Sequence, residues 1–396
     1  MDASAQSILT FNAGSSSLRF ALFDADCARS LEGKFERIGR PEARLILNGG
    51  EESPRTVSLT THVDCLPIIC ELIAAAGVAA PAAIAHRTVH GGPDHFETTA
   101  VTPLLLEELR AIKSFAPNHL PAAISLMEAA AGLWPEAPQL ACFDTAFHRD
   151  LPLVARLLPL PRRYAEQGIR RYGFHGLAFS SVQAELEHRS GGRIPSRLVL
   201  AHLGHGSSLA ALRSGRCIDT TMGFTPVGGL VMGTRTGDID PGVLAFLAAR
   251  EKLSPAALEK LVSRQSGLLG LSDVSSDTRE LLEKEGSDQG AAEALAVFVH
   301  QARKAIGACT ATLGGLDALV FSGGIGENSA VLRARLCAHF EYLDLILDPA
   351  LNAAHAPIIS TAASRVTVHV IPADEESALA AAARSFLSGA SLAPRA

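Results

Sequence analysis

The chain has 396 residues, of which 47% are hydrophobic and 19% are charged, and this composition excludes wholesale disorder and fibrous repeats. Its 35 basic and 41 acidic residues give a formal net charge of −6, so no basic excess is present to drive nucleic-acid binding. At roughly 100–200 residues per domain, the length predicts two domains.

The N-terminal residues Met1–Ser7 lack the basic segment and long apolar core of a secretory signal. No apolar run approaches the ~18–20 residues that a membrane-spanning helix needs. Seven cysteines are scattered along the chain without a C-x-x-C pair, which favours buried, reduced thiols. We therefore expect a cytoplasmic protein that binds neither membranes nor nucleic acid.

Short apolar runs alternate with longer helical patterns, which is typical of an α/β protein. The expected strands are 8–11, 18–23, 83–85, 139–143, 197–201, 209–212, 318–321 and 366–371. The expected helices are 66–78, 103–113, 121–132, 241–263, 288–313 and 377–387.

One tripeptide occurs at the head of each half of the chain. Ser16–Leu18 recurs as Ser207–Leu209, each time between two apolar runs. This repetition indicates a duplicated unit, that is, two similar α/β domains. The proline-rich stretch 151–163 is the expected boundary between them.

Three turns rich in small residues follow strands, at 12–17, 204–208 and 323–328. Glycine lets the backbone approach a ligand closely, and successive N–H groups form anion-binding concavities. Such turns are also common without any ligand, but three in one chain favour phosphate binding. The chain carries neither a Walker A loop nor a complete G-x-G-x-x-G, which argues against a nicotinamide enzyme.

Charged side chains form further candidate groups. Arg87 and Arg235 lie beside glycines, where a bidentate guanidinium suits a carboxylate or a phosphate, although a surface ion pair is the alternative. Asp144 follows an expected strand, at the end that faces the ligand crevice in open α/β sheets. Glu375 and Glu376 follow another expected strand. Their carboxylates suit Mg²⁺, and the alternative is that they complement the dipole of a following helix.

Several motifs together identify a family. The chain resembles the acetate kinases, within the sugar kinase/Hsp70/actin superfamily. The motifs that carry this resemblance are Asn12–Ser17, His86–Gly92, Phe143–His148, Arg170–Gly176, Asp219–Pro226, Met232–Pro241, Ser266–Gly270 and Gly324–Ser329.

The resemblance implies an α/β fold of two duplicated actin-like ATPase (ribonuclease H-like) domains facing an interdomain cleft. Residues 1–150 would form the N-terminal domain, completed by a C-terminal helix at about 376–396. Residues 151–375 would form the second domain and carry most of the nucleotide site. A homodimer is the family expectation.

The resemblance also implies the reaction, a reversible Mg²⁺-dependent transfer of the ATP γ-phosphate to acetate that gives acetyl phosphate and ADP. Mn²⁺ could replace Mg²⁺. Because a carboxylate nucleophile is already anionic, the protein needs to supply mainly positioning and charge neutralisation.

Residue roles follow from matching the motifs position by position. The implied catalytic residues are Arg87 and Arg235, which bracket the transferred phosphoryl group, His175, which bonds one of its oxygens, and Asp144, which orients Arg87. Asn12 and Glu375 would position the metal. The implied substrate-binding residues are Arg87, Val89, Asn118, Phe174 and Pro226. The implied ATP-binding residues are Arg19, His202, Gly204, His205, Gly206, Asp277, Thr278, Arg279, Gly324, Ile325, Gly326, Glu327 and Asn328, and His119 would lie near the phosphates.

The chain departs from the family pattern at three of these positions. Arg19 replaces a lysine, His205 replaces an asparagine in the second turn, and Asn118 replaces an apolar residue expected beside the substrate methyl group. A polar Asn118 favours a polar or shifted substrate, and methylene discrimination is worth only ~1–3 kcal/mol. Propionate or another short acid is therefore the alternative substrate.

Two other functions use the same fold. A sugar or polyol kinase would need Asp144 as a general base to deprotonate a hydroxyl. A nucleotide-dependent switch without acyl transfer would use the bound nucleotide only to drive a conformational change.

Overall fold

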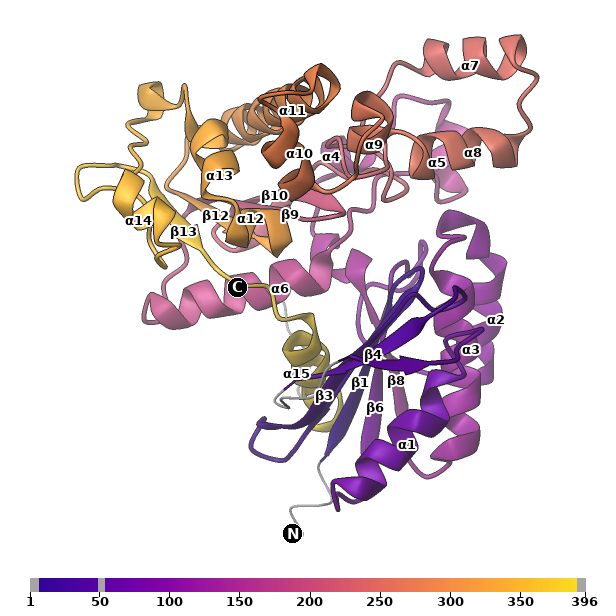
Figure 1. Ribbon diagram of the computed structural model, residues 1–396. Helices are drawn as coiled ribbons and strands as arrows, with labels where there is room; N and C mark the ends of the chain where they lie inside the picture. The colour runs from indigo at the N-terminus through magenta and orange to yellow at the C-terminus, as the bar shows by residue number, and fades with distance from the viewer. Residues whose placement is uncertain (1–6, 49–53, 390–396) are drawn as a thin grey trace. The chain divides into compact units, whose positions relative to one another are not determined.

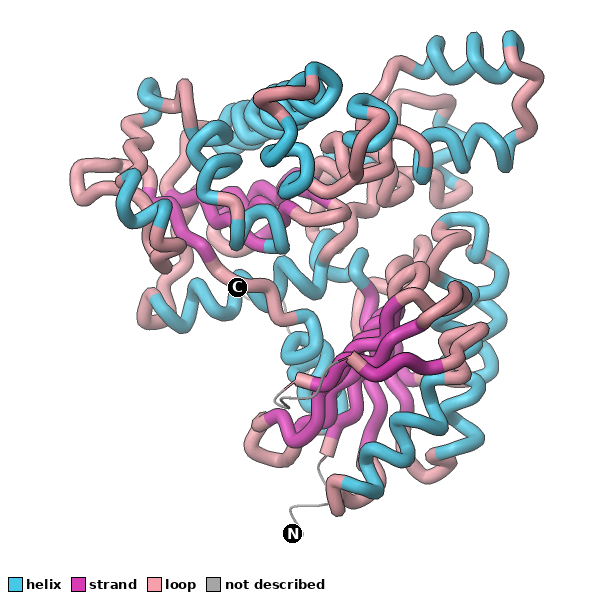
Figure 2. The backbone as a smooth tube through the Cα atoms, in the orientation of Figure 1, coloured by secondary structure: helices cyan, strands magenta, loops and turns pink. Residues whose placement is uncertain are grey.

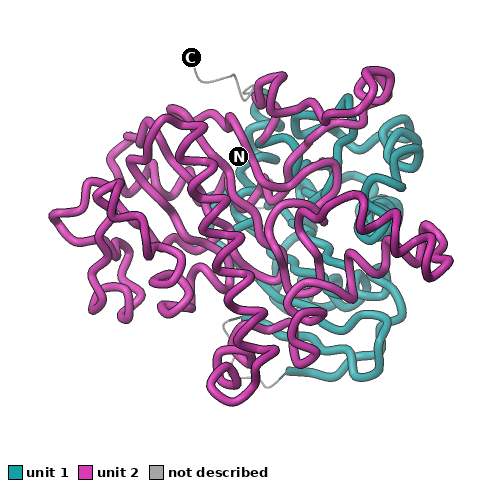
Figure 3. The backbone as a smooth tube through the Cα atoms, turned by 90° about the horizontal axis from the view of Figure 1, so that it is seen from above, with its two compact units in different colours: residues 1–147, 374–396 teal, residues 148–373 magenta. Residues whose placement is uncertain are grey.

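The computed structural model describes residues 7–48 and 54–389. The ends of the expected domains, residues 1–6 and 390–396, lie outside this range. The chain forms two compact units (Figure 3): unit 1 comprises residues 1–147 and 374–396, and unit 2 comprises residues 148–373. None of the helices in the described ranges combines the length and apolar content needed to span a membrane.

Unit 1 is built on an eight-stranded mixed sheet with the order β5-β4-β3-β2-β1-β6-β8-β7 (Figures 1 and 2). β1 pairs antiparallel with β2 and parallel with β6, which in turn pairs parallel with β8. The strands are β1 (Ile8–Ala13), β2 (Ser17–Phe23), β3 (Arg29–Glu36), β4 (Ala43–Leu47), β5 (Arg55–Val57), β6 (Ala83–Thr88), β7 (Thr99–Ala100) and β8 (Gln139–Phe143).

Helices cover both faces of this sheet. Strand alternation places Leu9 and Phe11 on the face where α1 (Cys65–Ala75) and α3 (Leu120–Leu133) bury their apolar side chains. The opposite face of β1 meets α15 (Glu375–Leu387), which also packs on β6. α2 (Pro103–Ala111) packs on α3. The last helix of the chain therefore belongs to unit 1, although residues 148–373 separate it from the rest of that unit in sequence.

Unit 2 contains a five-stranded sheet with the order β11-β10-β9-β12-β13. Its strands are β9 (Arg197–Leu203), β10 (Ser207–Arg213), β11 (Arg216–Thr220), β12 (Ala318–Ser322) and β13 (Thr367–Val370). The longer helices are α6 (Gly176–Arg189), α7 (Pro241–Arg250), α8 (Pro255–Arg264), α11 (Gln289–Leu313) and α13 (Ala330–Cys337). The shorter ones are α4 (Leu153–Arg156), α5 (Arg162–Glu166), α9 (Gly267–Ser272), α10 (Thr278–Lys284), α12 (Gly323–Asn328) and α14 (Pro349–Ala353).

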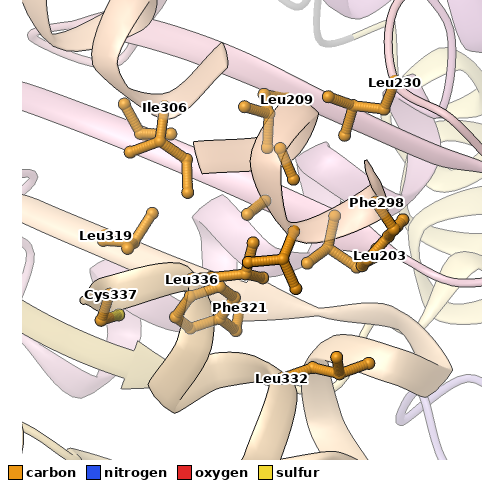
Figure 4. Close-up of a cluster of buried hydrophobic side chains, with 14 of the residues drawn as sticks. Leu203, Leu209, Leu230, Phe298, Ile306, Leu319, Phe321, Leu332, Leu336 and Cys337 are labelled. Atoms are coloured by element: carbon orange, nitrogen blue, oxygen red, sulfur yellow. The ribbon is translucent and has the colours of Figure 1, made fainter. Parts of the chain in front are cut away.

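The core of unit 2 lies between its sheet and α11. Phe298 and Ile306 of α11 are buried with Leu209 of β10 and Phe321 of β12 (Figure 4). Leu332 and Leu336 of α13 belong to the same cluster. The strands whose ends carry the glycine turns, β9 and β12, are therefore anchored by burial of apolar side chains.

Two expected elements are wrong, and a third is shorter than expected. The helix expected over 241–263 is two helices. α7 ends at Arg250, where the chain turns through Lys252 with a φ of +54°, and Ser254 caps α8 by accepting the Ala257 N–H. The turn expected at 323–328 is the short helix α12. The expected first turn is shorter than 12–17, since Asn12 still belongs to β1 and Ser17 already belongs to β2.

Adjacent leucines on α2 test how burial stabilises unit 1. Leu105 is 2% exposed and Leu104 is 65% exposed. We expect Leu105→Ala to lower the free energy of unfolding by about 2–5 kcal/mol, because it removes buried apolar surface and leaves a cavity. The matched control Leu104→Ala is expected to change it by less than about 0.5 kcal/mol. Equal losses in urea denaturation would contradict this assignment of the core.

Candidate active site

Charged side chains gather at one edge of the unit 1 sheet. Arg87 near the end of β6 donates from Nε and Nη2 to Oδ2 of Asp144, at 3.0 and 2.7 Å, and Asp144 directly follows β8. Arg87 Nη1 donates to Oδ1 of Asn12 at 2.9 Å and lies 3.3 Å from Oε2 of Glu375. The carboxyl ends of the parallel strands β1, β6 and β8 meet at this edge, which explains the grouping.

Asn12 connects this pair to the N-terminus of α15. Its amide nitrogen donates to Oε2 of Glu375 at 2.7 Å and to Oε1 of Glu376 at 3.0 Å. Both glutamates lie in the first turn of α15, where carboxylates complement the helix dipole. Asn12 therefore holds the carboxylates through its nitrogen, while its oxygen is held by Arg87.

The cluster is largely shielded from water, and this sets its charge states. The side chains of Arg87, Asp144 and Glu375 are 16%, 1% and 13% exposed. Burial by itself would lower the pKa of Arg87, but the carboxylates of Asp144 and Glu375 outweigh it and hold that pKa above its usual value. Burial, reinforced by the charge of Glu375, raises the pKa of Glu376.

Arg19 belongs to this cluster. It faces Asn12 across the β1–β2 ladder, and its charge acts to lower the pKa of the Glu376 carboxyl. The structure thus places Arg19 beside the residues expected to hold the metal, in unit 1, whereas the other expected ATP-binding residues lie in unit 2.

The carboxylates of Glu375 and Glu376 fit a hard divalent cation. Two glutamates lie side by side on one amide, and burial, together with the charge of Glu375, raises the pKa of Glu376. Among the described residues, no three His, Cys, Asp or Glu side chains converge as metal ligands. A site with two carboxylates suits Mg²⁺, which usually keeps several waters and binds substrate phosphates as well.

In unit 2, a second cluster surrounds the turn between β9 and β10. His175 Nδ1 lies 2.9 Å from the hydroxyl of Ser208, and the His175 and His202 rings lie 4.8 Å apart. His202 Nδ1 lies 3.2 Å from the hydroxyl of Ser322. The turn thus has two imidazoles beside it, each oriented by a serine.

Gly206 permits a close approach to this turn. A Cβ atom at Gly206 would lie 3.1 Å from Nε2 of His175 and 3.5 Å from Nη1 of Arg235. Arg235 Nη1 also donates to the carbonyl of Pro226 at 2.9 Å. Backbone amides, an imidazole and a guanidinium therefore converge, which is a suitable arrangement for phosphate oxygens.

His205 and Asp277 extend the second cluster. The His205 ring packs on Gly233, where a Cβ would lie 2.8 Å from its Nδ1. Burial and the charge of Arg235 lower the pKa of His205, while Asp277 opposes them. Asp277 caps α10 by accepting the Arg279 N–H at 2.9 Å, and the Arg279 side chain folds back on it while remaining 83% exposed.

Helix α12 is held from inside the protein. Glu327 Oε1 accepts hydrogen bonds from the N–H groups of Gly323 and Ala373, at 2.7 and 3.2 Å. This carboxylate therefore joins the start of α12 to the backbone at Ala373. The buried Arg333 donates to the carbonyls of Gly326 and Glu327, both at 2.8 Å. Of the residues expected to bind ATP here, Glu327 thus has a structural role.

The remaining expected residues lie on other segments of the two units. Val89 is buried just after β6, while Asn118 and His119 are half-buried just before α3. Phe174 is buried beside His175, and Thr278 is the buried first residue of α10. Gly204 opens the β9–β10 turn, Gly324 faces open space, and Ile325 and Asn328 lie on α12.

Two supporting residues escaped the sequence analysis. Ser208 lies in the expected turn 204–208 and Ser322 directly precedes the expected turn at 323–328, but neither pattern predicts a role for the side chain. The pairing of β9 with β12 brings Ser322 to His202, and the loop that precedes α6 brings His175 to Ser208 of β10.

Comparison with known proteins identifies the family. The sequence profile of the acetokinase family matches residues 7–381. The chain belongs to the acetokinase family. The prediction made from the motifs is thereby confirmed.

Individual relatives of this acetokinase agree. The acetate kinase of Rhodopseudomonas palustris is 41% identical over 381 residues, covering 93% of this chain and 95% of that protein. The propionate kinase of Citrobacter rodentium is 41% identical over 380 residues, covering 93% and 94%. The crystal structure of Porphyromonas gingivalis acetate kinase matches with a TM-score of 0.87 at 33% identity, covering 96% of this chain and 100% of that one. This likeness and the two mixed sheets confirm the expected α/β fold class of duplicated actin-like domains.

The raised pKa of Glu376 predicts a pH-dependent stability of this acetokinase. The folded protein binds this proton more tightly than the unfolded chain, whose ordinary value is 4.5, so stability decreases as pH rises through the raised pKa. In metal-free buffer we expect Glu376→Gln to melt at a higher temperature than the wild type near pH 7. The gap should close toward about pH 4, where the carboxyl is protonated.

Thermal melts across this pH range in EDTA would measure the effect. Glu107→Gln, at an exposed position on α2, is the matched control and should follow the wild type at every pH. A gap that widens on acidification would contradict the raised pKa.

Proposed function

We propose that this chain is an acetate kinase, which transfers the ATP γ-phosphate to the carboxylate of acetate and gives acetyl phosphate and ADP, reversibly. The observation that carries the proposal is the pair of clusters in a chain of this family. Arg87 is held by Asp144, Asn12 and Glu375 in unit 1, and Arg235 lies with His175 beside the β9–β10 turn in unit 2.

The chemistry of acyl phosphate formation suits these groups. A carboxylate attacks phosphorus without losing a proton, so no strong general base is required. Asp144 Oδ2 accepts two hydrogen bonds from Arg87, which supports a role in orienting the guanidinium. This observation also favours acyl transfer over the sugar-kinase alternative, in which Asp144 would act as the base.

With both substrates bound, Arg87 and Arg235 would neutralise charge on the substrate carboxylate and the transferred phosphoryl group. His175 would donate from Nε2 to an equatorial oxygen of that group, which requires Nδ1 to accept from Ser208. Donors placed where charge develops lower the barrier without reorganisation during the reaction.

The nucleotide would occupy unit 2. The β9–β10 turn with His202 and His205 would hold phosphates, while Asp277, Arg279 and the N-terminal residues of α12 would meet the adenosine. We propose that Glu375 and Glu376, oriented by Asn12, hold Mg²⁺. Bound there, Mg²⁺ would neutralise the charge of the nucleotide phosphates.

We also propose a homodimer. Apolar side chains on the outside of unit 2 support this: Phe246 of α7 is 59% exposed, and Leu153 and Val154 of α4 are 60% and 88% exposed. Large apolar side chains that are exposed in one chain are candidates for burial in a subunit interface. A sedimentation mass equal to that of one chain, 41.5 kDa, would contradict the dimer.

A panel of acids tests the function and the substrate together. Purified protein, ATP, Mg²⁺ and hydroxylamine, which traps acyl phosphates, are incubated with acetate, propionate, butyrate and hydroxylated acids. We expect signal with acetate and propionate, and Asn118→Leu should increase the ratio of acetate to larger-acid efficiency. A flat ratio would remove Asn118 from the pocket. Absence of signal with every acid would overturn acyl transfer, and carboxylate-independent ATP hydrolysis would then favour the switch.

Replacing either proposed catalytic arginine should affect turnover selectively. We expect Arg87→Ala and Arg235→Ala to lower kcat by about 10²–10³-fold, because each removes a donor from the transition state, while the KM for ATP changes much less. Arg197→Ala removes a surface arginine paired with Asp317 and is the matched control, with kcat near the wild-type value. Near-normal turnover in either active-site variant would exclude that arginine from the mechanism.

A further inference from the structure

A buried histidine outside the expected site residues contacts the backbone beside His175. His148, the first residue of unit 2, is 2% exposed. Its Nε2 lies 3.0 Å from the carbonyl oxygen of Phe174, and its Nδ1 lies 3.2 Å from Sγ of Cys217. The edge of the ring meets Phe179 of α6, with the centroids 5.9 Å apart. The side chain is thus fixed by three separate parts of unit 2.

The partners determine where the protons lie. A carbonyl oxygen only accepts, so Nε2 of His148 carries the proton and donates to Phe174. Nδ1 of a neutral imidazole then has only a lone pair, and the Cys217 thiol donates to it. That thiol also lies 3.4 Å from the carbonyl of Asp219, but a single S–H serves one acceptor well, and Nδ1 is the nearer. Burial lowers the pKa of His148 to about 4 and raises the pKa of Cys217 well above its usual range, which keeps both groups neutral.

The carbonyl held by His148 belongs to the peptide that enters His175. His175 has a φ of +60°, and Gly173, two residues earlier, has a φ of +77°. Left-handed backbone at a non-glycine residue persists only where the surroundings enforce it. At Gly173 any Cβ would lie 2.5 Å from Cδ2 of His148, so the loop and the imidazole fit tightly together. The bond to Phe174 is therefore one of the contacts that enforce this backbone.

The orientation of this peptide decides where the His175 ring points. His175 directly precedes α6, its Nδ1 reaches Ser208, and its Nε2 lies beside Gly206 and the phosphate-binding turn. If the 174–175 peptide rotated, the ring would leave Ser208 and its Nε2 would move away from Gly206.

We propose that His148 is a positioning residue for phosphoryl transfer: its Nε2–H holds the Phe174 carbonyl, the Cys217 thiol keeps Nδ1 unprotonated, and His175 is thereby directed at the phosphate-binding turn. This inference rests on the proposed function, in which His175 contacts the transferred phosphoryl group. His148 itself touches no substrate. Cys217 is a free cysteine outside the expected site residues, and its role would be to donate to Nδ1 of His148.

Two variants, each of which keeps an amide at the position of one ring nitrogen, distinguish a positioning role of His148 from a role in packing alone. The amide nitrogen of glutamine reaches the place of Nε2, whereas the shorter asparagine places its amide at Nδ1. We therefore expect His148→Asn to lower kcat by about 10- to 100-fold, the range for a displaced reacting group, with the KM for ATP nearly unchanged. His148→Gln should recover most of the lost kcat.

Melting temperatures measured in parallel complete the comparison. Both variants replace a buried ring by a smaller polar group. If His148 had a purely structural role, both variants would lose stability, and kcat would either stay unchanged in both or fall equally in both. Either pattern would overturn the proposal. If the wild type forms no acyl phosphate at all, the proposed function fails on its own, before any variant is compared.

A second pair of variants and a spectroscopic readout do not depend on the folding of the His148 variants. Cys217→Ser keeps a hydrogen-bond donor and should retain kcat, whereas Cys217→Ala removes it and should lower kcat. Equal activity of the two would overturn the role of the thiol. In the wild type, ¹⁵N chemical shifts of labelled histidine should show His148 as the Nε2–H tautomer at neutral pH. A protonated Nδ1 would overturn the assignment whatever the activity.

Discussion

The ion pair between Arg87 and Asp144 is the constraint on which unit 1 depends. Asp144 is 1% exposed, and a carboxylate so removed from water is tolerated only when it is paired and hydrogen-bonded. Removing one partner of such a pair typically costs about 3–5 kcal/mol, because the other charge stays buried. The amide of Asn12 and the first turn of α15 complete the pairing. The chain returns to unit 1 at residue 374, and this segment therefore both places Glu375 beside Arg87 and packs α15 against the sheet.

In unit 2 the corresponding constraint is backbone geometry. The β9–β10 turn approaches His175 and Arg235 closely because Gly206 has no side chain. His175 is held in a left-handed conformation and is oriented by Ser208. Unit 1 thus contributes a fixed charge network, and unit 2 contributes a fixed arrangement of donors. The proposed phosphoryl transfer would use both, since positioning and charge neutralisation dominate the catalysis of that reaction.

Much of the fold follows from sequence patterns, and the exceptions have physical causes. The strand over 139–143 and the long helix near 288–313 are confirmed, because they are apolar runs with clear end signals. Strands β3, β4 and β5 are not among the expected strands. β3 is rich in charged residues and β4 and β5 are short, and they extend the sheet in sequence by pairing outward from β2. α12 resembled a turn because three glycines weaken any helical pattern, and internal bonds from Glu327 and Arg333 stabilise it instead.

The sequence by itself determined the family and the α/β class, and it supplied the candidate residues for the chemistry, because short motifs survive as local patterns. Tertiary structure alone decided their partners. The grouping of Arg19 with Asn12 and Glu376, the serines that orient His175 and His202, and the contact of His148 with Phe174 join residues far apart in the chain. Such contacts depend on strand pairing and burial, and no local pattern encodes them.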